Sequence, residues 1–323
     1  MKKEDLRIVF MGTPEFAVET LRALVENGYQ VVAVVTQPDK PVGRHSSVQP
    51  SPVKVYAQEQ GLPVLQPEKM KDPAFVETLR SYQANLQVVV AFRMLPEVVW
   101  AMPAYGTFNV HAALLPQYRG AAPINWAVIN GETKTGVTTF FLDHDIDTGR
   151  IIMQLPFAIP DDADVEYVYD GLMQLGADIC LQTLDRIVAA DGHPESYEQS
   201  ADSSSPASEL KPAPKIFNET CEISWSKTAK QVYDFVRGLS PYPGAWTTLV
   251  DEKGKEMVLK IYRTTKTQLP SEGRVGQVVA GKKHLYIGCI DCLLQVDELQ
   301  LAGKKRMDAP SFLNGMKGNY RCL

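Results

Sequence analysis

Two short apolar runs near the start of the chain, separated by one helix-length segment, constrain its fold most strongly. Residues 7–11 and 31–36 are continuous apolar runs of the kind that form buried strands. Between them, apolar residues recur at helical spacing, Thr13 is suited to cap the start of a helix, and Gly28 is placed to end it. A strand, a helix and a strand in this order predict a parallel sheet covered by helices.

Later segments first extend this pattern and then replace it. Apolar runs at residues 86–91, 107–111 and 137–142 predict further strands of the same sheet, and residues 165–190 form a long helical stretch. After residue 245 the chain contains several short runs of strand type with turns between them, which predict a small β-barrel. We therefore expect an α/β domain followed by a smaller, mainly β domain.

A Ser/Pro-rich stretch separates these two patterns. Residues 202–208 lack apolar periodicity and are typical of an interdomain linker. The length of 323 residues also suits two domains, at roughly 100 to 200 residues per domain. We expect a first domain over residues 1–197, a linker over residues 198–212 and a second domain over residues 213–323.

The charge is divided unequally between the two halves. The formal net charge of −5, taken whole, argues against a nucleic-acid partner. However, residues 1–202 hold 15 Lys and Arg against 26 Asp and Glu, a net of −11, whereas residues 203–323 hold 18 against 12, a net of +6. The second domain is therefore basic, and the total does not exclude a polyanionic partner for it.

Two features bear on the compartment. No apolar run reaches the roughly 18 residues of a membrane-spanning helix, and the first residues do not have the pattern of a signal peptide. The five cysteines are scattered and odd in number, which suits a reducing compartment. We expect a cytoplasmic protein without a membrane partner, and nothing in the sequence demands more than a monomer.

Several common functional motifs are missing or incomplete. The first strand-to-helix turn, residues 12–16, has one glycine where a dinucleotide-binding turn has three. Residues 143–147 alternate carboxylates as a calcium loop does, but Thr148 stands where that loop needs glycine. The chain has no paired Cys/His zinc spacing, no Gly-x-Ser-x-Gly elbow and no phosphate-binding loop. We therefore expect no metal, and neither a serine hydrolase nor an NTPase.

The most informative stretch is residues 107–116. Strand alternation puts Asn109 and His111 on one face, with Cα atoms roughly 6.5–7 Å apart, near the end of a strand where open α/β sheets bind ligands. Asp147 is suited to orient an imidazole that projects from a neighbouring strand. The spacing alone leaves two readings open, a pair of side chains that satisfies buried backbone groups and a functional site.

If these residues form a site, their chemistry is specific. An amide, an imidazole and a carboxylate without an obvious nucleophile can stabilise a tetrahedral oxyanion while an external amine attacks a carbonyl. That combination points to acyl transfer between two bound substrates.

Several longer motifs carry a family resemblance that covers nearly the whole chain. They are Gly12-Thr13-Pro14, Asn109-Val110-His111, Leu114-Leu115-Pro116, Arg119-Gly120-Ala121-Ala122-Pro123, Asp147-Thr148-Gly149, Ile223-Ser224-Trp225, Arg237-Gly238-Leu239-Ser240-Pro241, Pro243-Gly244-Ala245-Trp246 and Gly303-Lys304-Lys305-Arg306-Met307. With these motifs the chain closely resembles the 10-formyltetrahydrofolate-dependent formyltransferases, above all the members that act on methionyl-tRNA. The resemblance implies a Rossmann-like parallel-sheet formyltransferase domain followed by a smaller, OB-like β-barrel domain.

The resemblance also implies substrates and site residues. It implies 10-formyltetrahydrofolate as co-substrate and initiator methionyl-tRNA as the acceptor of the formyl group, without a metal. The family's catalytic residues fall on Asn109, His111 and Asp147. Its folate-binding positions fall on Phe92, Ala113, Leu114, Leu115 and Pro116, and its tRNA contacts on Arg44, Lys304, Lys305 and Arg306.

Three positions depart from the family's pattern. Ala113 stands where serine is usual, and Phe92-Arg93 stands where Tyr-Gly is usual. The lysines that commonly follow Arg44, in a loop that enters the acceptor stem in the family, are replaced by Ser46 and Ser47, so this loop should grip phosphate less strongly through charge. The role of Arg93 is left open between a contact with the folate's glutamate tail and plain solvation.

Other functions stay open on the sequence alone. Glycinamide ribonucleotide and amino-sugar nucleotides are alternative formyl acceptors of related enzymes, although the basic second domain favours RNA. A non-catalytic RNA-binding protein on a Rossmann-like scaffold would have no use for the set Asn109, His111 and Asp147.

Overall fold

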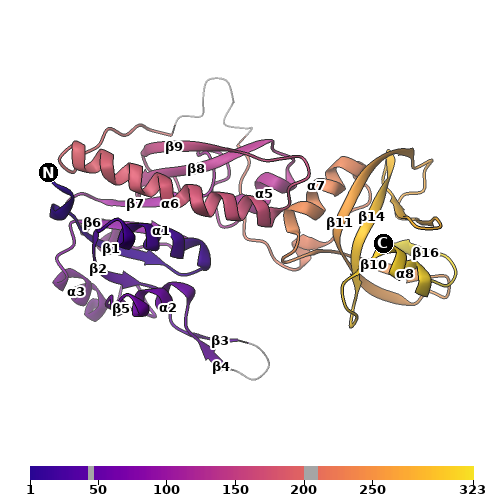
Figure 1. Cartoon of the computed structure of the whole chain (residues 1–323), viewed down its shortest axis with the longest axis horizontal. Helices are drawn as coiled ribbons and strands as arrows, with labels where there is room; N and C mark the ends of the chain where they lie inside the picture. Colours follow the sequence, from indigo (N-terminus) through magenta and orange to yellow (C-terminus); the bar gives the residue numbers. More distant parts are fainter. Residues whose placement is uncertain (43–46, 200–209) are drawn as a thin grey trace. The chain divides into compact units, whose positions relative to one another are not determined.

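The computed structural model describes residues 1–42, 47–199 and 210–323 (Figure 1). The chain divides into two compact units. The first comprises Met1–Gly120, Lys134–Ala158 and Tyr169–Pro212, and the second comprises Ala121–Thr133, Ile159–Val168 and Ala213–Leu323.

A seven-stranded sheet forms the core of the first unit (Figure 1). Its strand order is β5-β2-β1-β6-β7-β8-β9, and all pairs up to β7 are parallel, whereas β8 and β9 run antiparallel to their neighbours. The predicted Rossmann-like parallel sheet is therefore confirmed, with an antiparallel end that the sequence reading did not include. The strands are β1 (Arg7–Gly12), β2 (Gln30–Val35), β5 (Val64–Leu65), β6 (Leu86–Val90), β7 (Thr107–His111), β8 (Lys134–Phe141) and β9 (Ile151–Ala158).

Helix α1 (Glu15–Glu26) connects β1 and β2, as the apolar periodicity predicts. Its end is also as predicted, because Gly28 follows the last turn with φ 71°, a left-handed conformation that favours glycine. The prediction that Thr13 caps the helix is wrong, since the cap position is Pro14 and has no side-chain hydrogen bond. The Thr13 hydroxyl instead accepts a hydrogen bond from a backbone N–H after β2, at 3.4 Å. The other helices that lie wholly or mainly in this unit are α2 (Pro52–Glu59), α3 (Pro73–Ser81), α4 (Glu97–Trp100) and α6 (Val165–Ala189).

Helix α6 covers one face of the sheet at β7 and β8. The Thr139 hydroxyl of β8 lies 2.8 Å from that of Thr183 on α6, and Val110 of β7 pairs directly with Thr139. Residues directly opposite each other on neighbouring strands share a face. Because side chains alternate along a strand, Asn109 and His111 project from the face opposite α6.

A nearly closed antiparallel barrel forms the core of the second unit (Figure 1). Its strands follow the order β12-β13-β14-β11-β10-β16, β15 pairs with β14, and a bridge between Gln277 and Arg321 joins the two ends of the path. The predicted OB-like barrel is thereby confirmed. Its strands are β10 (Ala245–Asp251), β11 (Glu256–Pro270), β12 (Val278–Ala280), β13 (Leu285–Gly288), β14 (Cys292–Leu301), β15 (Met307–Asp308) and β16 (Tyr320–Cys322).

Helix α7 carries much of the packing of this unit. Arg237 and Asp234 form an ion pair on α7 in which both side chains are buried, with Nη2 and Oδ1 at 2.8 Å. A Cβ at Gly238 would lie 2.6 Å from a side-chain atom of Ile129, so only glycine allows this approach. The helices of the unit are α5 (Pro123–Ile129), α7 (Ala229–Leu239) and α8 (Ala309–Gly315).

Among the described residues, no helix combines the length and the apolar character required to span a membrane.

Candidate active site

Strand β7 presents Asn109 and His111 at its carboxyl end. Asn109 pairs with Phe140 and His111 pairs with Thr138, two alternate residues of β8, so the two side chains share a face as the alternation predicts. His111 is buried, with 6% of its surface exposed, whereas Asn109 is half-buried. An amide and an imidazole therefore lie side by side at the end of β7, where Tyr118 and Asp147 approach the imidazole.

The imidazole of His111 has a hydrogen bond at one nitrogen and a carboxylate near the other. Its Nε2 donates a hydrogen bond to the backbone carbonyl of Tyr118 at 2.9 Å. Its Nδ1 lies 3.8 Å from Oδ2 of Asp147, which is beyond hydrogen-bond distance. The ring also packs edge-on against Phe140, with centroids 6.3 Å apart. Of the two ring nitrogens, Nδ1 is thus the one left for a substrate, as an acceptor in the neutral ring and as a donor in the imidazolium.

Asp147 reaches His111 from the loop between β8 and β9. Its backbone has φ 56°, in the left-handed region that residues other than glycine rarely adopt. Its Oδ2 accepts a hydrogen bond from the backbone N–H of Gly120 at 2.9 Å. The structure therefore brings Asp147 into contact with His111 from 36 residues further along the chain.

The amide of Asn109 has an unused acceptor. Its Oδ1 is buried and has no hydrogen-bond partner among the described residues. A buried polar atom without a partner costs about 1–3 kcal/mol, and such atoms in native proteins call for an explanation. A substrate N–H that bonds to this oxygen would supply one.

The loop that follows β7 is anchored by side chains of the next two strands. Thr138 donates from Oγ1 to the carbonyl of Ala113 at 2.6 Å and accepts from the N–H of Leu115 at 3.2 Å. Gln154 of β9 donates from Nε2 to the Leu115 carbonyl and to Thr138 Oγ1, both at 2.9 Å. Buried hydrogen bonds of this kind fix the backbone of the loop.

The folate-binding positions taken over from the family differ in exposure. Ala113 and Leu115 are buried, at 0% and 3% exposed. Phe92, Leu114 and Pro116 are half-buried and retain surface. The last three residues can contact a ligand directly, whereas the first two shape the loop.

Arg93, whose role the sequence left open, contacts backbone groups of another segment. Its guanidinium contacts the carbonyl of Pro67 and donates to that of Glu68 at 2.8 Å. Burial lowers the pKa of Arg93 from its usual value. The side chain thus joins the end of β6 to another segment and is not freely solvated.

The tRNA-binding positions taken over from the family fall in two places. Arg44 lies outside the described residues, in the connection between β3 (Lys40–Val42) and β4 (Ser47–Gln49). Lys304 and Lys305 are exposed on the turn between β14 and β15. Arg306 is also exposed, but its guanidinium pairs with the Glu298 carboxylate, with Nε and Oε1 at 2.6 Å, and covers the ring of Tyr262 at 4.2 Å.

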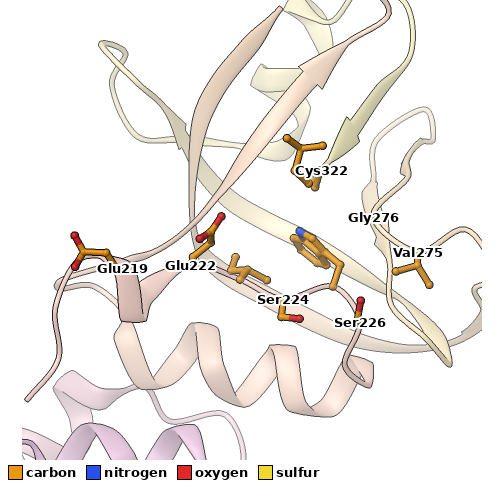
Figure 2. Close-up of a pocket in the computed structure, with 10 residues that line it drawn as sticks. Glu219, Glu222, Ser224, Ser226, Val275, Gly276 and Cys322 are labelled. Atoms are coloured by element: carbon orange, nitrogen blue, oxygen red, sulfur yellow. The ribbon is translucent and has the colours of Figure 1, made fainter. Parts of the chain in front are cut away.

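The barrel unit contains an open cavity of about 440 Å³ (Figure 2). It contains none of the residues predicted for catalysis or for substrate binding, and its lining includes no histidine. Its polar lining comes from Glu219, Glu222, Ser224 and Ser226. In the part of the chain that the structure describes, no group of three or more His, Cys, Asp or Glu residues could hold a metal ion.

Several residues of the site were missed by sequence reasoning. Thr138, Gln154 and Gln199 are polar residues with ordinary surroundings in the sequence, and the Tyr118 and Gly120 backbone groups carry no side-chain signal at all. Thr138 is fully buried in β8, where six successive residues are buried, and the sequence of this strand does not single it out.

The chain matches two family models. The model described as "Formyl transferase" matches residues 6–184, and the model described as "Formyl transferase, C-terminal domain" matches residues 215–317. The chain belongs to the formyl transferase family. The family resemblance predicted from the sequence motifs is thereby confirmed.

Curated relatives of this formyl transferase are similar over nearly their full length. A methionyl-tRNA formyltransferase of Parabacteroides distasonis is 60% identical over 319 residues, which is 98% of each chain. One of Bacteroides thetaiotaomicron is 57% identical over 318 residues, again 98% of each chain.

Solved structures share the fold at much lower identity. The N-formyltransferase from Helicobacter canadensis, in complex with folinic acid and dTDP-3-aminofucose, superposes with a TM-score of 0.64 at 20% identity. The match covers 94% of this chain and 100% of that one. At this identity the likeness supports the two-part fold and not a shared acceptor.

Proposed function

We propose that this chain transfers the formyl group of 10-formyltetrahydrofolate to the amino group of methionine on initiator tRNA, in the cytoplasm. Asn109, His111 and Asp147 are the proposed catalytic residues. The observation that carries the proposal is their convergence on one sheet face, with Asp147 against His111 and a buried acceptor left free on Asn109. The substrate that accepts the formyl group is inferred from the relatives at 57–60% identity, which are named methionyl-tRNA formyltransferase.

The proposed chemistry needs donors for a developing negative charge. When the methionine amine attacks the formyl carbon, the formyl oxygen gains charge that fixed N–H donors stabilise. The bond from the formyl carbon to N10 of the folate then breaks, and the proton that the amine loses ends on N10 of the released tetrahydrofolate. The side-chain amide of Asn109 supplies one donor, and Nδ1 of His111 supplies the other in the imidazolium form, which the Asp147 carboxylate favours. Nδ1 takes this role because Nε2 already donates to the Tyr118 carbonyl.

Asp147 serves the imidazole and the attacking amine. Its carboxylate, fixed by the N–H of Gly120, faces the Nδ1 edge of His111 and keeps that donor turned toward the site. The free Oδ1 of Asn109 suits an N–H of the amine, which would satisfy an otherwise unpaired buried oxygen. Both substrates are then oriented by groups of one sheet face.

The folate has an apolar surface available beside these donors. Phe92, Leu114 and Pro116 keep exposed apolar surface, which suits a flat pterin ring. Ala113 and Leu115 act indirectly, because Thr138 bonds to their backbone groups and so fixes the loop. No metal is proposed, because hydrogen-bond donors of the chain polarise the carbonyl.

The tRNA body is assigned to the second domain, residues 213–323, linked by residues 198–212 to the catalytic domain, residues 1–197. Lys304 and Lys305 are exposed and available to contact phosphates of the tRNA. Arg306 is proposed to contact the tRNA while it remains paired with Glu298. Arg44 is the proposed contact of the first domain. We propose that the chain acts as a monomer.

One competition experiment tests the proposal. The protein is supplied with 10-formyltetrahydrofolate and, separately, with methionyl initiator tRNA, glycinamide ribonucleotide or an amino-sugar nucleotide, and the formylated amine is identified by mass. We expect formylation of methionyl-tRNA alone. Formylation of only a small-molecule amine would overturn the tRNA assignment.

A further inference from the structure

The side-chain amide of Gln199 joins two loops that hold the catalytic groups. Its Nε2 donates to the backbone carbonyls of Asp147 and Gly149, each at 2.8 Å. Its Oε1 accepts from Nε and Nη2 of Arg119, at 3.1 and 2.7 Å. A neutral amide offers two donor hydrogens and two acceptor sites, so every hydrogen-bonding position of Gln199 is occupied.

Gln199 is itself held in a fixed place. Two residues before it, Tyr197 pairs with Ile151 at the start of β9 through two backbone hydrogen bonds of 2.8 and 3.0 Å. The Arg150 guanidinium also bonds to the side chain and the backbone carbonyl of Ser196. The segment therefore presents the amide to the loop from a rigid edge of the sheet.

The loop that Gln199 holds needs an external support. Asp147 adopts the left-handed backbone conformation, which costs an ordinary residue about 1–2 kcal/mol. Such conformations persist only where surrounding contacts fix them, and they cluster at functional sites. Both carbonyls that Gln199 binds belong to this turn, and the other residue that it binds, Arg119, precedes Gly120, whose N–H fixes the Asp147 carboxylate.

We propose that Gln199 is a positioning residue of the transfer reaction, which holds Asp147 and the Arg119 loop so that the carboxylate faces His111. The proposal rests on the catalytic role proposed for Asp147. Glutamine is the side chain that fits: glutamate has no donors for the two carbonyls, asparagine is one methylene too short, and methionine has the length without strong hydrogen bonds.

The test compares Gln199→Met with the parent under steady-state conditions, with methionyl initiator tRNA and 10-formyltetrahydrofolate. Displacement of a group that orients a catalytic residue typically lowers turnover about 10–100-fold. We expect a decrease of that size in kcat, with the KM of each substrate changed by less than about 2-fold, because Gln199 touches neither substrate in the proposed arrangement. Gln199→Glu keeps the length and the Arg119 contact but loses both donors, so the same decrease in kcat is expected. This second variant replaces Gln199→Met in the test if Gln199→Met does not fold.

A control variant separates positioning from general loss of stability. Thr183→Val removes a buried hydroxyl that bonds to Thr139 on the other face of the same sheet. It should lower the melting temperature while kcat stays within about 2-fold of the parent. If the Gln199 variants behave like this control, with lowered melting temperature and unchanged kcat, Gln199 is only structural and the proposal is wrong.

A double variant tests whether the effect runs through Asp147. In an Asp147→Asn background, Gln199→Met should lower kcat by less than about 3-fold, because the group that it positions has already been changed. An equal decrease in both backgrounds would show independent action and would overturn the proposal. A failure of the proposed function can be told apart from a failure of the role proposed for Gln199, because the parent itself would then not formylate methionyl-tRNA. In that case the variants are compared with the parent on the amine that the parent does formylate.

Discussion

The family motifs of the two units serve different ends. In the first unit they supply Asn109, His111 and Asp147, which converge on one face of the sheet and leave an acceptor on Asn109 without a partner. In the second unit the motif residue Arg237 is fully engaged, with Asp234 on one side and the carbonyl of Ala163 on the other, at 2.8 Å each. The motif residue Trp225 is likewise satisfied, because its indole N–H donates to Thr247 at 3.0 Å.

The difference shows how to separate catalysis from architecture. A polar motif residue whose hydrogen bonds are complete within the chain supports the fold, whereas one that retains a free donor or acceptor is available to a ligand. On this criterion we assign Asn109 to the proposed chemistry and Arg237 to the packing of the barrel unit. The following predictions test that separation, from the largest expected effect to the smallest.

Substitution of Asn109 should affect activity and not stability. Asn109→Ala removes one donor to the oxyanion, which typically costs about 10²–10³ in rate, equivalent to about 2.7–4 kcal/mol. The free energy of unfolding should stay level or rise, because the substitution removes a buried oxygen without a partner. Steady-state kinetics and urea unfolding check the two parts. Turnover equal to that of the parent would refute the assignment of Asn109.

Substitution of Arg237 should have the opposite signature. Arg237→Met leaves the buried carboxylate of Asp234 with Lys230 as its remaining charged partner. Removal of one member of a buried pair costs about 3–5 kcal/mol, and we expect the lower end because Lys230 remains. Denaturant unfolding measures the loss, and kcat per folded molecule should be unchanged. A drop in kcat without a loss of stability would contradict the comparison.

Thr138 combines both roles, since it is fully bonded but supports the site. Thr138→Val keeps the shape and leaves the Leu115 N–H and the Ala113 carbonyl without this partner. We expect a loss of about 1–3 kcal/mol in unfolding free energy, and a raised KM for 10-formyltetrahydrofolate, because the substitution loosens the proposed folate loop. Thr183→Val, on the opposite face, serves as the matched control with unchanged KM. If both variants raise this KM equally, the loop is not the cause.

The exposed lysines of the barrel should show the smallest effect. With Lys304→Gln and Lys305→Gln combined, the slope of log affinity for tRNA against log salt should decrease by about 1.4–1.8, because each phosphate contact contributes about 0.7–0.9. Filter binding at several salt concentrations gives the slope, and kcat at saturating tRNA should not change. Lys253→Gln combined with Lys255→Gln is the matched control on another turn of the barrel. Equal slopes for the parent and the Lys304/Lys305 variant would remove these residues from the tRNA surface.

Part of the fold was predictable because it follows from local pattern. The β1-α1-β2 unit appears where apolar periodicity changes from strand to helix type, and Gly28 ends α1 as its conformational freedom suggests. The cap at Thr13 was not predictable, because its hydroxyl bonds to a segment more than 20 residues away. The antiparallel strand β9 was also missed, since its pairing with β8 depends on the hairpin between them.

The sequence by itself determined the chemical types at the site and the face that they share. Strand alternation places Asn109 and His111 together, since alternate residues of one strand project from the same face. Tertiary structure alone decided which nitrogen of His111 is free, how the Asp147 turn is held, and that Gln199 reaches it. These depend on contacts between residues 7 to 80 positions apart along the chain, whose meeting is fixed by the packing of the sheet and not by any local pattern.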